Sequence, residues 1–436
     1  MHLPENARYC IRRLEQAGFA VYAVGGCVRD ACLGLTPHDY DLCTAATPEQ
    51  IAAVFADHSL VRAGEKHGTI GVILGAEVLE ITTFRTEGDY ADSRHPGWVA
   101  FVPDIETDLS RRDFTVNAMA FSPTRGYADP FGGREDLKKG ILRAVGDPSL
   151  RFTEDALRIL RGVRFAVRYG LAVEEKTMGA MTSLAPRLQN IAAERIFEEL
   201  CKLLPLVTAE DLLRFAPVLT EVIPELAPTV GFQQHSIHHT YDIFTHAAHV
   251  VAGVPADLTL RWAALLHDVG KPACFTLDEE GNGHFYGHAK QGAELANAIL
   301  RRLKAPNALR EQVVLLVERH MTLIEPERKA VRRWLSRLGP ETFGQLLQLQ
   351  EADMGSKGTG KPAEMAQFDR LRALAQQIGA ENACLQIKDL AVNGNDLMAL
   401  GYRGPAIGQA LQKLLELVLE ETLPNEKEAL LRALQC

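Results

Sequence analysis

The chain has 436 residues, a length that predicts two to four domains rather than one. Its composition, 47% hydrophobic and 24% charged, is that of a globular protein and excludes a disordered or collagen-like chain. The formal charge of −9 argues against non-specific coating of nucleic acid, although one local basic groove stays compatible with it.

Two further features indicate the cellular compartment in which the protein works. No apolar run approaches the length of a membrane span, and the first residues lack the basic and apolar parts of a signal peptide, so we expect a cytoplasmic protein without membrane segments. The eight cysteines show no CxxC pair or zinc-finger spacing, which favours reduced thiols over a disulfide framework.

Residues 1–145 combine two periodicities: a helical pattern over residues 7–17 precedes strand-like runs at 20–24, 69–74 and 78–84. From residue 151 onwards, helical patterns rich in Leu, Ala, Glu and Arg dominate. The sequence therefore predicts an α+β fold, with a mixed sheet and helices in an N-terminal head and all-helical regions after it. Breaks in the pattern suggest four segments: 1–145 (head), 146–230 (neck), 231–355 and 356–436 (tail).

The first strand runs directly into Gly25 and Gly26, and Arg29 lies in the apparent helix that follows. Paired glycines between a strand and a helix let the backbone approach a ligand, and amides at a helix start favour phosphate. Such turns are also common as plain structure, so this motif alone leaves both interpretations open.

Asp39 and Asp41 come soon after the glycine turn. In an extended chain, residues two positions apart project from the same face, and two carboxylates held this way repel unless a divalent cation such as Mg²⁺ or Mn²⁺ lies between them. The alternative is a solvated acidic turn. Glu80, between apolar neighbours in a later strand, is either a third acid at the edge of the same pocket or a surface residue.

The series GGCVRD, DYDL and LEI resembles the nucleotidyltransferase superfold of the DNA polymerase β type. This resemblance implies a site that binds a nucleoside triphosphate through two metals and releases pyrophosphate. The motif RRDFTVNA follows at residues 111–118 and contains Arg112, Asp113 and Asn117. Arginine can neutralise phosphate and a carboxylate can accept from ribose hydroxyls, although a surface ion-pair cluster has the same composition.

The segment RFTEDALRILRGVRFAVRYG predicts a helix with one cationic side, since Arg158, Arg161, Arg164 and Arg168 recur at steps of three and four residues. On such a helix Asp155 and Arg158 would present an acceptor beside a donor. Cytosine and adenine each offer an amino donor beside a ring-nitrogen acceptor, whereas uracil and guanine present the reverse order. The pair could therefore accept C and A and refuse U and G, with the protein acting as template.

These motifs together resemble the class II CCA-adding enzymes, the tRNA nucleotidyltransferases that build or repair the 3′ CCA end. Further motifs that carry the resemblance are GEKHGTIGV, TEGDYADSRHP, DPFGGREDL and ERIFEEL. It implies tRNA, CTP and ATP as partners, Mg²⁺ as cofactor, and Asp39 and Asp41 as catalytic metal ligands. The nucleotide-binding residues that we expect are Gly25, Gly26, Arg29, Arg112, Asp113, Asn117, Asp155, Arg158, Arg161 and Arg164.

Segment 88–94, GDYADSR, is similar to the flexible loop that the family needs to switch from C to A, which argues against an enzyme that adds only C. Bacterial poly(A) polymerase is the rival family. Against it stand GEKHGTIGV, in place of that group's basic-basic-Phe signature, and the lack of a strongly basic C-terminal extension. A phosphohydrolase whose head only binds RNA is a further alternative.

Nine of the fourteen histidines fall in residues 231–355. His246, HDVGKP with His267 and Asp268, GHAKQGA, and EADMG with Asp353 follow in the order that resembles the HD phosphohydrolase superfamily. The resemblance implies those four residues as ligands of a divalent transition metal, with a phosphodiesterase or phosphatase activity that some CCA-adding enzymes carry. The alternative is a helical spacer with structural histidines.

A second metal in this region would use two further histidines. His288 and His320 could serve it, but Met321 follows His320 where many HD domains have Asp, which leaves a binuclear site open. In the last segment, apolar residues lie on one face of a predicted helix after a Gly-Pro break. This segment resembles the family's tail that grips the tRNA elbow, and plain helix packing explains the pattern equally well.

Overall fold

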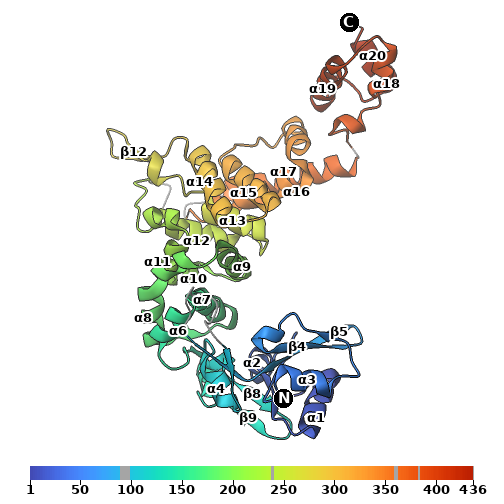
Figure 1. The fold of residues 1–436 in the computed structure, drawn as a ribbon. Coiled ribbons are helices and arrows are strands. Elements are labelled where there is room, and N and C mark those ends of the chain that lie inside the picture. The colour runs from blue at the N-terminus through green and yellow to red at the C-terminus, as the bar shows by residue number, and fades with distance from the viewer. Residues whose placement is uncertain (89–98, 237–239, 358–361, 382, 436) are drawn as a thin grey trace. The chain divides into compact units, whose positions relative to one another are not determined.

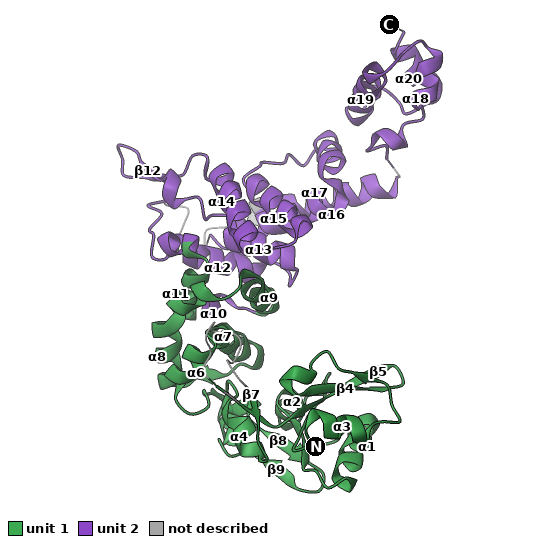
Figure 2. Cartoon of the chain, viewed as in Figure 1, with its two compact units in different colours: residues 1–206, 214–224 green, residues 207–213, 225–436 purple. Residues whose placement is uncertain are grey.

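The computed structural model describes the chain except for residues 89–98, 237–239, 358–361, 382 and 436. The chain forms two compact units, shown in Figure 2. Unit 1 comprises residues 1–206 and 214–224, and unit 2 comprises residues 207–213 and 225–436. The division into four segments stays a prediction. In the described residues, no helix combines the length and apolar character needed to cross a membrane.

A mixed seven-stranded sheet forms the centre of the head in unit 1 (Figure 1). Its strands, in spatial order, are β3 (Leu60–Val61), β4 (Thr69–Leu74), β5 (Glu77–Thr83), β2 (Asp41–Thr44), β1 (Val21–Val24), β8 (Ala120–Ser122) and β9 (Gly126–Ala128). β2 and β5 pair in parallel, and the other neighbours are antiparallel. A separate hairpin pairs β6 (Arg85–Glu87) with β7 (Val99–Phe101).

The longer predicted elements are confirmed. The helix expected at residues 7–17 is α1 (Glu5–Gln16), and the three expected strands are β1, β4 and β5. α1 forms because Ala7, Cys10, Ile11 and Leu14 give it one buried face, with Glu5 in its first turn and Arg13 in its last. β3 and β8, with two and three residues, are too short to show a periodicity.

Short helices cover the sheet. α1 packs against α3 (Pro48–Val54), whose start is fixed by a capping box between Thr47 and Gln50. A core of sheet and helix side chains, including Val24, Phe84 and Leu109, joins the sheet to α4 (Ile105–Ser110). The remaining helices of the head are α2 (Gly26–Cys32), α5 (Gly133–Lys139) and the single 3₁₀ turns at Glu65–His67 and Thr115–Asn117.

The rest of unit 1 is helical apart from the parallel pair β10 (Ile141–Leu142) and β11 (Ala172–Val173). Its helices are α6 (Pro148–Glu154), α7 (Leu157–Tyr169), α8 (Glu175–Leu184), a 3₁₀ segment (Ala185–Asn190), α9 (Ala193–Leu203) and α11 (Ala216–Val222). α7 packs on α9, and it ends at Gly170, which takes the left-handed conformation with φ of 61°.

Unit 2 contains most of the chain's longer helices. The first helices of unit 2 are the short α10 (Ala209–Arg214, whose last residue belongs to unit 1), α12 (Ile243–Gly253), α13 (Leu258–Leu266), α14 (His288–Arg302), α15 (Asn307–Arg319), α16 (Arg328–Gly355) and α17 (Pro362–Ala380). α16 bends at Gly339, which has φ of 75° and precedes Pro340. The small hairpin β12 (Thr276–Leu277) and β13 (Gly283–His284) joins α13 to α14.

The last helices, α18 (Gly394–Ala399), α19 (Pro405–Leu419) and α20 (Lys427–Ala433), share a separate apolar core. Leu411, Leu414, Leu415 and Val418 of α19 are buried in it. The α+β class is confirmed, and the helical part contains only short strands besides its helices in the described residues.

Candidate functional sites

A cavity of about 620 Å³ opens in unit 1 and gathers most of the predicted site residues. Its lining includes every predicted nucleotide-binding residue together with the two acids: Gly25, Gly26, Arg29, Asp39, Asp41, Arg112, Asp113, Asn117, Asp155, Arg158, Arg161 and Arg164. Arg111, Arg168 and Arg195 also line it. The cavity is therefore wide, and arginines outnumber acidic residues in its lining.

The strand register places the acids beside the glycine turn. Val24, the residue before Gly25, pairs with Asp41 at the start of β2. Asp39 lies two residues before β2 rather than within a strand, so the expectation of one strand face holds only for Asp41. Both carboxylates nevertheless reach the same cavity.

The pKa of Asp41 is raised above its ordinary value. Asp41 is exposed to solvent, yet the cavity walls partly desolvate it and raise its pKa; Arg112 lowers the pKa, and Glu80 and Asp39 raise it further. Glu80 lies on β5 beside Asp41, because the residues after them, Ile81 and Leu42, are paired. In the described part of the chain neither Asp39 nor Asp41 forms an ion pair with a basic side chain. Two carboxylates in one cavity, with the attraction of Arg112 acting on Asp41 but no ion pair, fit a divalent cation.

Gly25 allows a close approach of Arg112. Its φ is 70°, and a Cβ on it would lie 2.9 Å from Nη1 of Arg112. Arg112 is oriented by Asp108, which is fully buried and lies 3.2 Å from Nη2 of Arg112. Asp108 also binds Arg111 at 2.8 Å and accepts from the backbone amide of Arg85. This carboxylate therefore fixes the basic pair at the cavity wall.

Asp113 is buried and faces Arg161, whose Nη2 lies 2.7 Å from Oδ2 of Asp113. Burial would raise the pKa of Asp113, but Arg161 and Asn117 outweigh it and lower the pKa to about 2. Nδ2 of Asn117 donates to Asp113 over 3.0 Å, and Oδ1 of Asn117 accepts from Arg29. Arg29 in turn donates to the hydroxyl of Tyr169. These contacts link the glycine turn, the RRD motif and α7.

The predicted continuous helix over residues 151–170 is wrong at Asp155. α6 ends at Glu154, and Asp155 is extended, with φ of −143° and ψ of 103°. Its Oδ1 accepts from the backbone amide of Leu157, and this local hydrogen bond competes with the helix. Helical spacing therefore does not place Asp155 beside Arg158, and the structure shows only that both line the same cavity.

Each of the two predicted base-reading residues has a protein partner. Oδ2 of Asp155 accepts from Nη2 of Arg195 over 2.9 Å. Arg158 donates to Glu154 over 2.6 Å and to the backbone carbonyl of Arg111 over 3.0 Å. Arg195, in the ERIFEEL motif of α9, was not among the predicted site residues.

The other arginines of α7 differ in exposure. Arg164 is buried against Glu199, with Nε 2.6 Å from Oε2. Arg161 lies near the ring of Phe165, and Arg168 is exposed. Segment 88–94, expected to be a flexible loop, lies outside the described residues except for Gly88.

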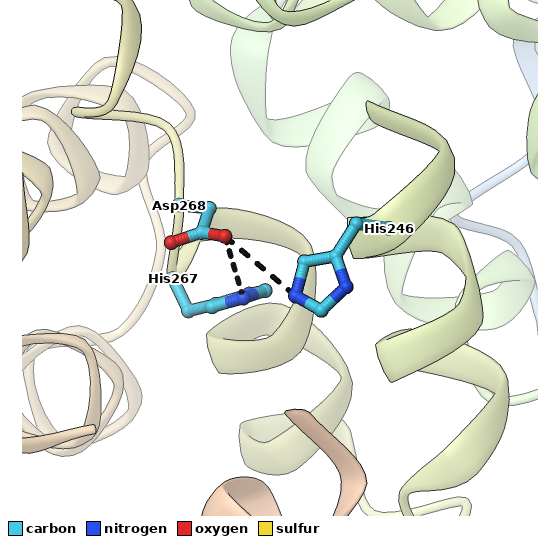
Figure 3. A group of neighbouring side chains, drawn as sticks. All are labelled: His246, His267 and Asp268. Carbon is cyan, nitrogen blue, oxygen red and sulfur yellow. Dashed lines mark ion pairs between the residues drawn. The ribbon is translucent and has the colours of Figure 1, made fainter. Parts of the chain in front are cut away.

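A second cluster of titratable side chains lies in unit 2 and contains all four predicted ligands. His246 comes from α12, His267 and Asp268 follow α13, and Asp353 lies near the end of α16. Nε2 of His246 lies 2.9 Å from Asp353 and 3.7 Å from Asp268, and Nε2 of His267 lies 3.2 Å from Asp268. Figure 3 shows the two imidazoles directed at the carboxylate of Asp268.

Two more histidines of the cluster lie near the other carboxylate oxygen of Asp268. Nε2 of His288 lies 3.5 Å and Nε2 of His320 lies 3.7 Å from Oδ1 of Asp268. The ligand atoms of His246, His267 and Asp268 all lie within 4.8 Å of one another, as do those of Asp268, His288 and His320. Asp268 is thus shared between two groups, each of which could hold a metal ion.

The backbone orients three of these imidazoles in the same way. Nδ1 of His267, His288 and His320 lies 2.7 to 2.8 Å from the carbonyl oxygen of the residue three positions earlier. An Nδ1–H that donates to a carbonyl leaves Nε2 with its lone pair for a metal. Nε2 of His267 is buried and makes no hydrogen bond, which fits a missing metal ligand bond.

The charges of this cluster are strongly perturbed. Burial would raise the pKa of Asp268, but His267 and Lys271 hold it well below its usual range. Burial, together with the charge of His267, lowers the pKa of His320 to about 4, and burial also lowers the pKa of His288. By contrast, burial would lower the pKa of His267, but Asp268 and Asp353 outweigh it and raise the pKa. Imidazoles beside carboxylates are the ligand set of divalent transition metals.

Comparisons with known proteins identify the class of the first site. A family model described as "Poly A polymerase head domain" matches residues 21–143, and one described as "Probable RNA and SrmB- binding site of polymerase A" matches residues 170–229. The head therefore defines a nucleotidyltransferase of the polymerase β type. A third model, for domain 2 of tRNA nucleotidyltransferases, matches residues 284–434.

Relatives that match the whole chain narrow this class. The CCA-adding enzyme of Levilactobacillus brevis is 35% identical over 442 residues, which cover 99% of this chain and 98% of the relative. The chain belongs to the family of class II CCA-adding enzymes, which are tRNA nucleotidyltransferases. A Streptococcus pneumoniae member is 50% identical over 200 residues, which cover 46% of this chain and 50% of the relative.

Solved structures agree. The crystal structure of the Bacillus stearothermophilus CCA-adding enzyme in complex with CTP is similar with a TM-score of 0.73 and 29% identity, covering 100% of this chain and 98% of the other. The Thermotoga maritima enzyme complexed with tRNA shares the fold with a TM-score of 0.61 at 22% identity, covering 99% of this chain and 96% of the other.

Proposed function

We propose that this chain adds C and A to the 3′ end of tRNA from CTP and ATP at the cavity of unit 1. The single observation that carries the proposal is that Asp39, Asp41 and Gly25, whose φ is positive, line one cavity together with a large group of arginines. The complex of the B. stearothermophilus relative with CTP supports the choice of substrate.

Asp39 and Asp41 would hold divalent metal, most suitably Mg²⁺. Bound there, the metal lowers the pKa of the attacking tRNA 3′ hydroxyl and offsets the charge of the leaving pyrophosphate. Arg112 and Arg161, at the wall beside the acids, would neutralise the triphosphate, and Asp108 and Asp113 would fix these guanidinium groups. Arg29 and Asn117 would keep Asp113 in place, because Arg29 donates to Asn117 and Asn117 donates to Asp113.

Asp155 and Arg158 would read the base. The acceptor of Asp155 suits the amino group that cytosine and adenine share, and a donor of Arg158 suits the adjacent ring nitrogen. Arg195 would keep the carboxylate in place, since it binds Oδ2 of Asp155. Arg164, paired with Glu199, would support α7 rather than touch the base.

The direct test supplies radiolabelled CTP and ATP together with tRNA that lacks its CCA end. We expect two C residues and one A residue per tRNA, and no incorporation from UTP or GTP. Unlimited addition of A would indicate poly(A) polymerase activity, and no incorporation at all would remove the proposal. Asp155→Ala should lose discrimination against UTP more than it loses metal binding.

We further propose that the cluster of unit 2 is an HD-type metal centre that hydrolyses phosphate esters. His246, His267, Asp268 and Asp353 would hold a divalent transition metal, and His288 and His320 would take part in a second position that shares Asp268. Five buried ligand side chains around one carboxylate support this better than a structural role, because buried charged and polar groups are costly unless ion pairs or a metal compensate them.

The test of this second proposal measures phosphate ester hydrolysis separately from nucleotide addition. Purified protein loaded with Mn²⁺, Ni²⁺, Co²⁺ or Zn²⁺ should hydrolyse 2′,3′-cyclic nucleotides, and His267→Ala should abolish this while CCA addition continues. If the wild-type protein hydrolyses nothing with any of these metals, the hydrolase proposal falls and the cluster is structural.

A further inference from the structure

A cavity of about 250 Å³ adjoins the cluster of unit 2, and its lining has two chemically different parts. Its floor comprises cluster residues and two lysines: Asp268, His288, Asp353, Lys271 and Lys357. His284, Phe285 and Tyr286 belong to its aromatic rim. The aromatic residues have no part in the metal-binding proposal, so their presence calls for another explanation.

Tyr286 is the most distinctive of these residues. It is 79% exposed, although burying an aromatic ring is favourable. Its ring stacks on that of His284, with the centroids 5.3 Å apart and the planes at 8°. Nε2 of His284 lies 2.9 Å from Oδ2 of Asp278, whose other oxygen accepts from two backbone amides of the β12–β13 turn. The exposed ring is therefore supported in one orientation.

The floor is suited to an anion once a metal is bound. Lys271 Nζ lies 2.8 Å from Asp268, and Lys357 Nζ lies 3.3 Å from Asp353. The two ammonium groups offset the charge of the two carboxylates, so a divalent ion bound there would make the floor positive. A phosphate group is the anion that such a floor attracts.

A short turn of the chain connects the aromatic rim of the cavity to its floor. Tyr286 precedes Gly287, which takes the left-handed conformation with φ of 81°, and His288 is the first residue of α14. A platform at the rim and a ligand residue at the floor are thus two positions apart in the chain. A ligand that contacts both Tyr286 and the floor must therefore carry its phosphate close to a flat ring, with one small group such as a sugar between them.

We propose that Tyr286, backed by His284, is a specificity-determining residue that stacks on the nucleobase of a ribonucleotide whose 2′ or 3′ oxygen carries the phosphate bound at the floor. The inference rests on the proposed hydrolase function of the same cluster. Stacking on an aromatic ring tolerates every base, so the site accepts any base but requires one. In hydrolysis of a cyclic ester, a water oxygen bonds to phosphorus, one ring P–O bond breaks and the freed ribose oxygen takes the proton.

The kinetic test compares two cyclic esters that differ in the base. 2′,3′-cyclic AMP carries one, and glycerol 1,2-cyclic phosphate has the same five-membered ring without it. Tyr286→Ala should raise KM for cyclic AMP about tenfold, with kcat within about twofold, and leave the glycerol ester unchanged. Tyr286→Phe should restore the wild-type KM. An RNA oligonucleotide with a cyclic 3′ end shows whether free nucleotides or RNA ends are preferred.

Leu277→Ala is the matched control. Leu277 lies on β12 of the same hairpin and is 55% exposed, but it does not line the cavity. It should behave as the wild type with both esters. An equal change of KM for both esters in Tyr286→Ala, or no change for either, would overturn the proposal.

A binding measurement separates this inference from the hydrolase proposal. The fluorescence of 2-aminopurine riboside 3′-monophosphate is quenched when its base stacks, and the protein is used loaded with Zn²⁺, because the floor attracts phosphate once a metal is bound. We expect quenching by the wild type and by Leu277→Ala that is clearly reduced in Tyr286→Ala. If the wild type hydrolyses no ester yet shows this difference, only the hydrolase proposal fails. Equal quenching by all variants overturns the platform, whatever the activity.

Discussion

The two acidic sites of this chain gather charge in opposite ways. In unit 1, Asp39 and Asp41 lie at the wall of a wide cavity, exposed to solvent and without a histidine among the lining residues. In unit 2, Asp268 and Asp353 are buried among four imidazoles and two lysines. The first site offers few protein ligands and much room, and the second offers many ligands and little room.

This difference indicates how each site obtains its metal. Mg²⁺ commonly uses one or two carboxylates and completes its shell with water and substrate phosphates. The acids of unit 1 therefore suit an ion that arrives with the nucleotide. Imidazoles with carboxylates suit a transition metal that stays bound without substrate. The predictions below test this contrast.

The largest effect is expected from Asp41→Ala. Loss of one of the two acids should reduce incorporation of CMP into tRNA by about 1,000-fold, because positioning and charge neutralisation supply most of the rate in nucleotidyl transfer. Single-turnover incorporation measures this loss. His267→Ala is the reciprocal control and should keep at least half of the wild-type rate. A similar loss in both variants would mean that the two sites act as one.

Metal content gives the next prediction. After dialysis into metal-free buffer, the wild-type protein should retain about one transition-metal ion per chain, and His267→Ala should retain almost none. Elemental analysis of the dialysed proteins checks this. Asp41→Ala, with the cluster intact, should match the wild type. Equal metal content in all three proteins would contradict the resident-metal account.

A moderate effect is expected from Arg195→Ala. Without its partner, the carboxylate of Asp155 is free to turn, so kcat/KM for CTP and ATP should fall about tenfold and misincorporation of UMP should rise. Arg214→Ala, an exposed arginine that does not line the cavity, is the control. If Arg195→Ala keeps wild-type selectivity, then Arg195 does not position the base-reading carboxylate.

The smallest effect concerns acid stability. The pKa of Asp113 is about 2 in the folded protein and 3.8 ordinarily, so its ionised form stabilises the fold above pH 3.8 by roughly 2 kcal/mol, and this contribution is lost as the pH falls towards 2. Asp113→Asn lacks the titration. Its stability deficit against the wild type, followed by circular dichroism, should shrink between pH 5 and pH 2.5. A deficit independent of pH would rule out the ionised pair with Arg161.

Sequence patterns predicted the long elements and the order of the motifs, and the limits of the prediction have physical causes. β1, β4 and β5 have alternating or buried apolar residues, whereas β2 begins with the exposed Asp41 and its other three residues are all buried, so it shows no alternation. The break at Asp155 arises from a side-chain hydrogen bond to Leu157, which helical propensity does not include.

Partners distant in the chain were also missed. Arg195 lies 40 residues from Asp155, and only the packing of α9 brings it there. Asp108 lies four residues before Arg112, so this contact could have been expected from the spacing of one helical turn. Lys271 lies within the HDVGKP motif, so its position beside Asp268 could have been expected from the spacing of one helical turn. The grouping of His246 with Asp353 depended on the motif order, because 107 residues separate them.

The central claim, that the acids of unit 1 bind metal together with a nucleotide, is tested most directly by Mn²⁺ titration followed by electron paramagnetic resonance in the His267→Ala background. Tight Mn²⁺ binding should require CTP and should vanish when Asp41→Ala is added. Binding of Mn²⁺ that is equally tight without CTP, or that survives the loss of Asp41, would contradict it.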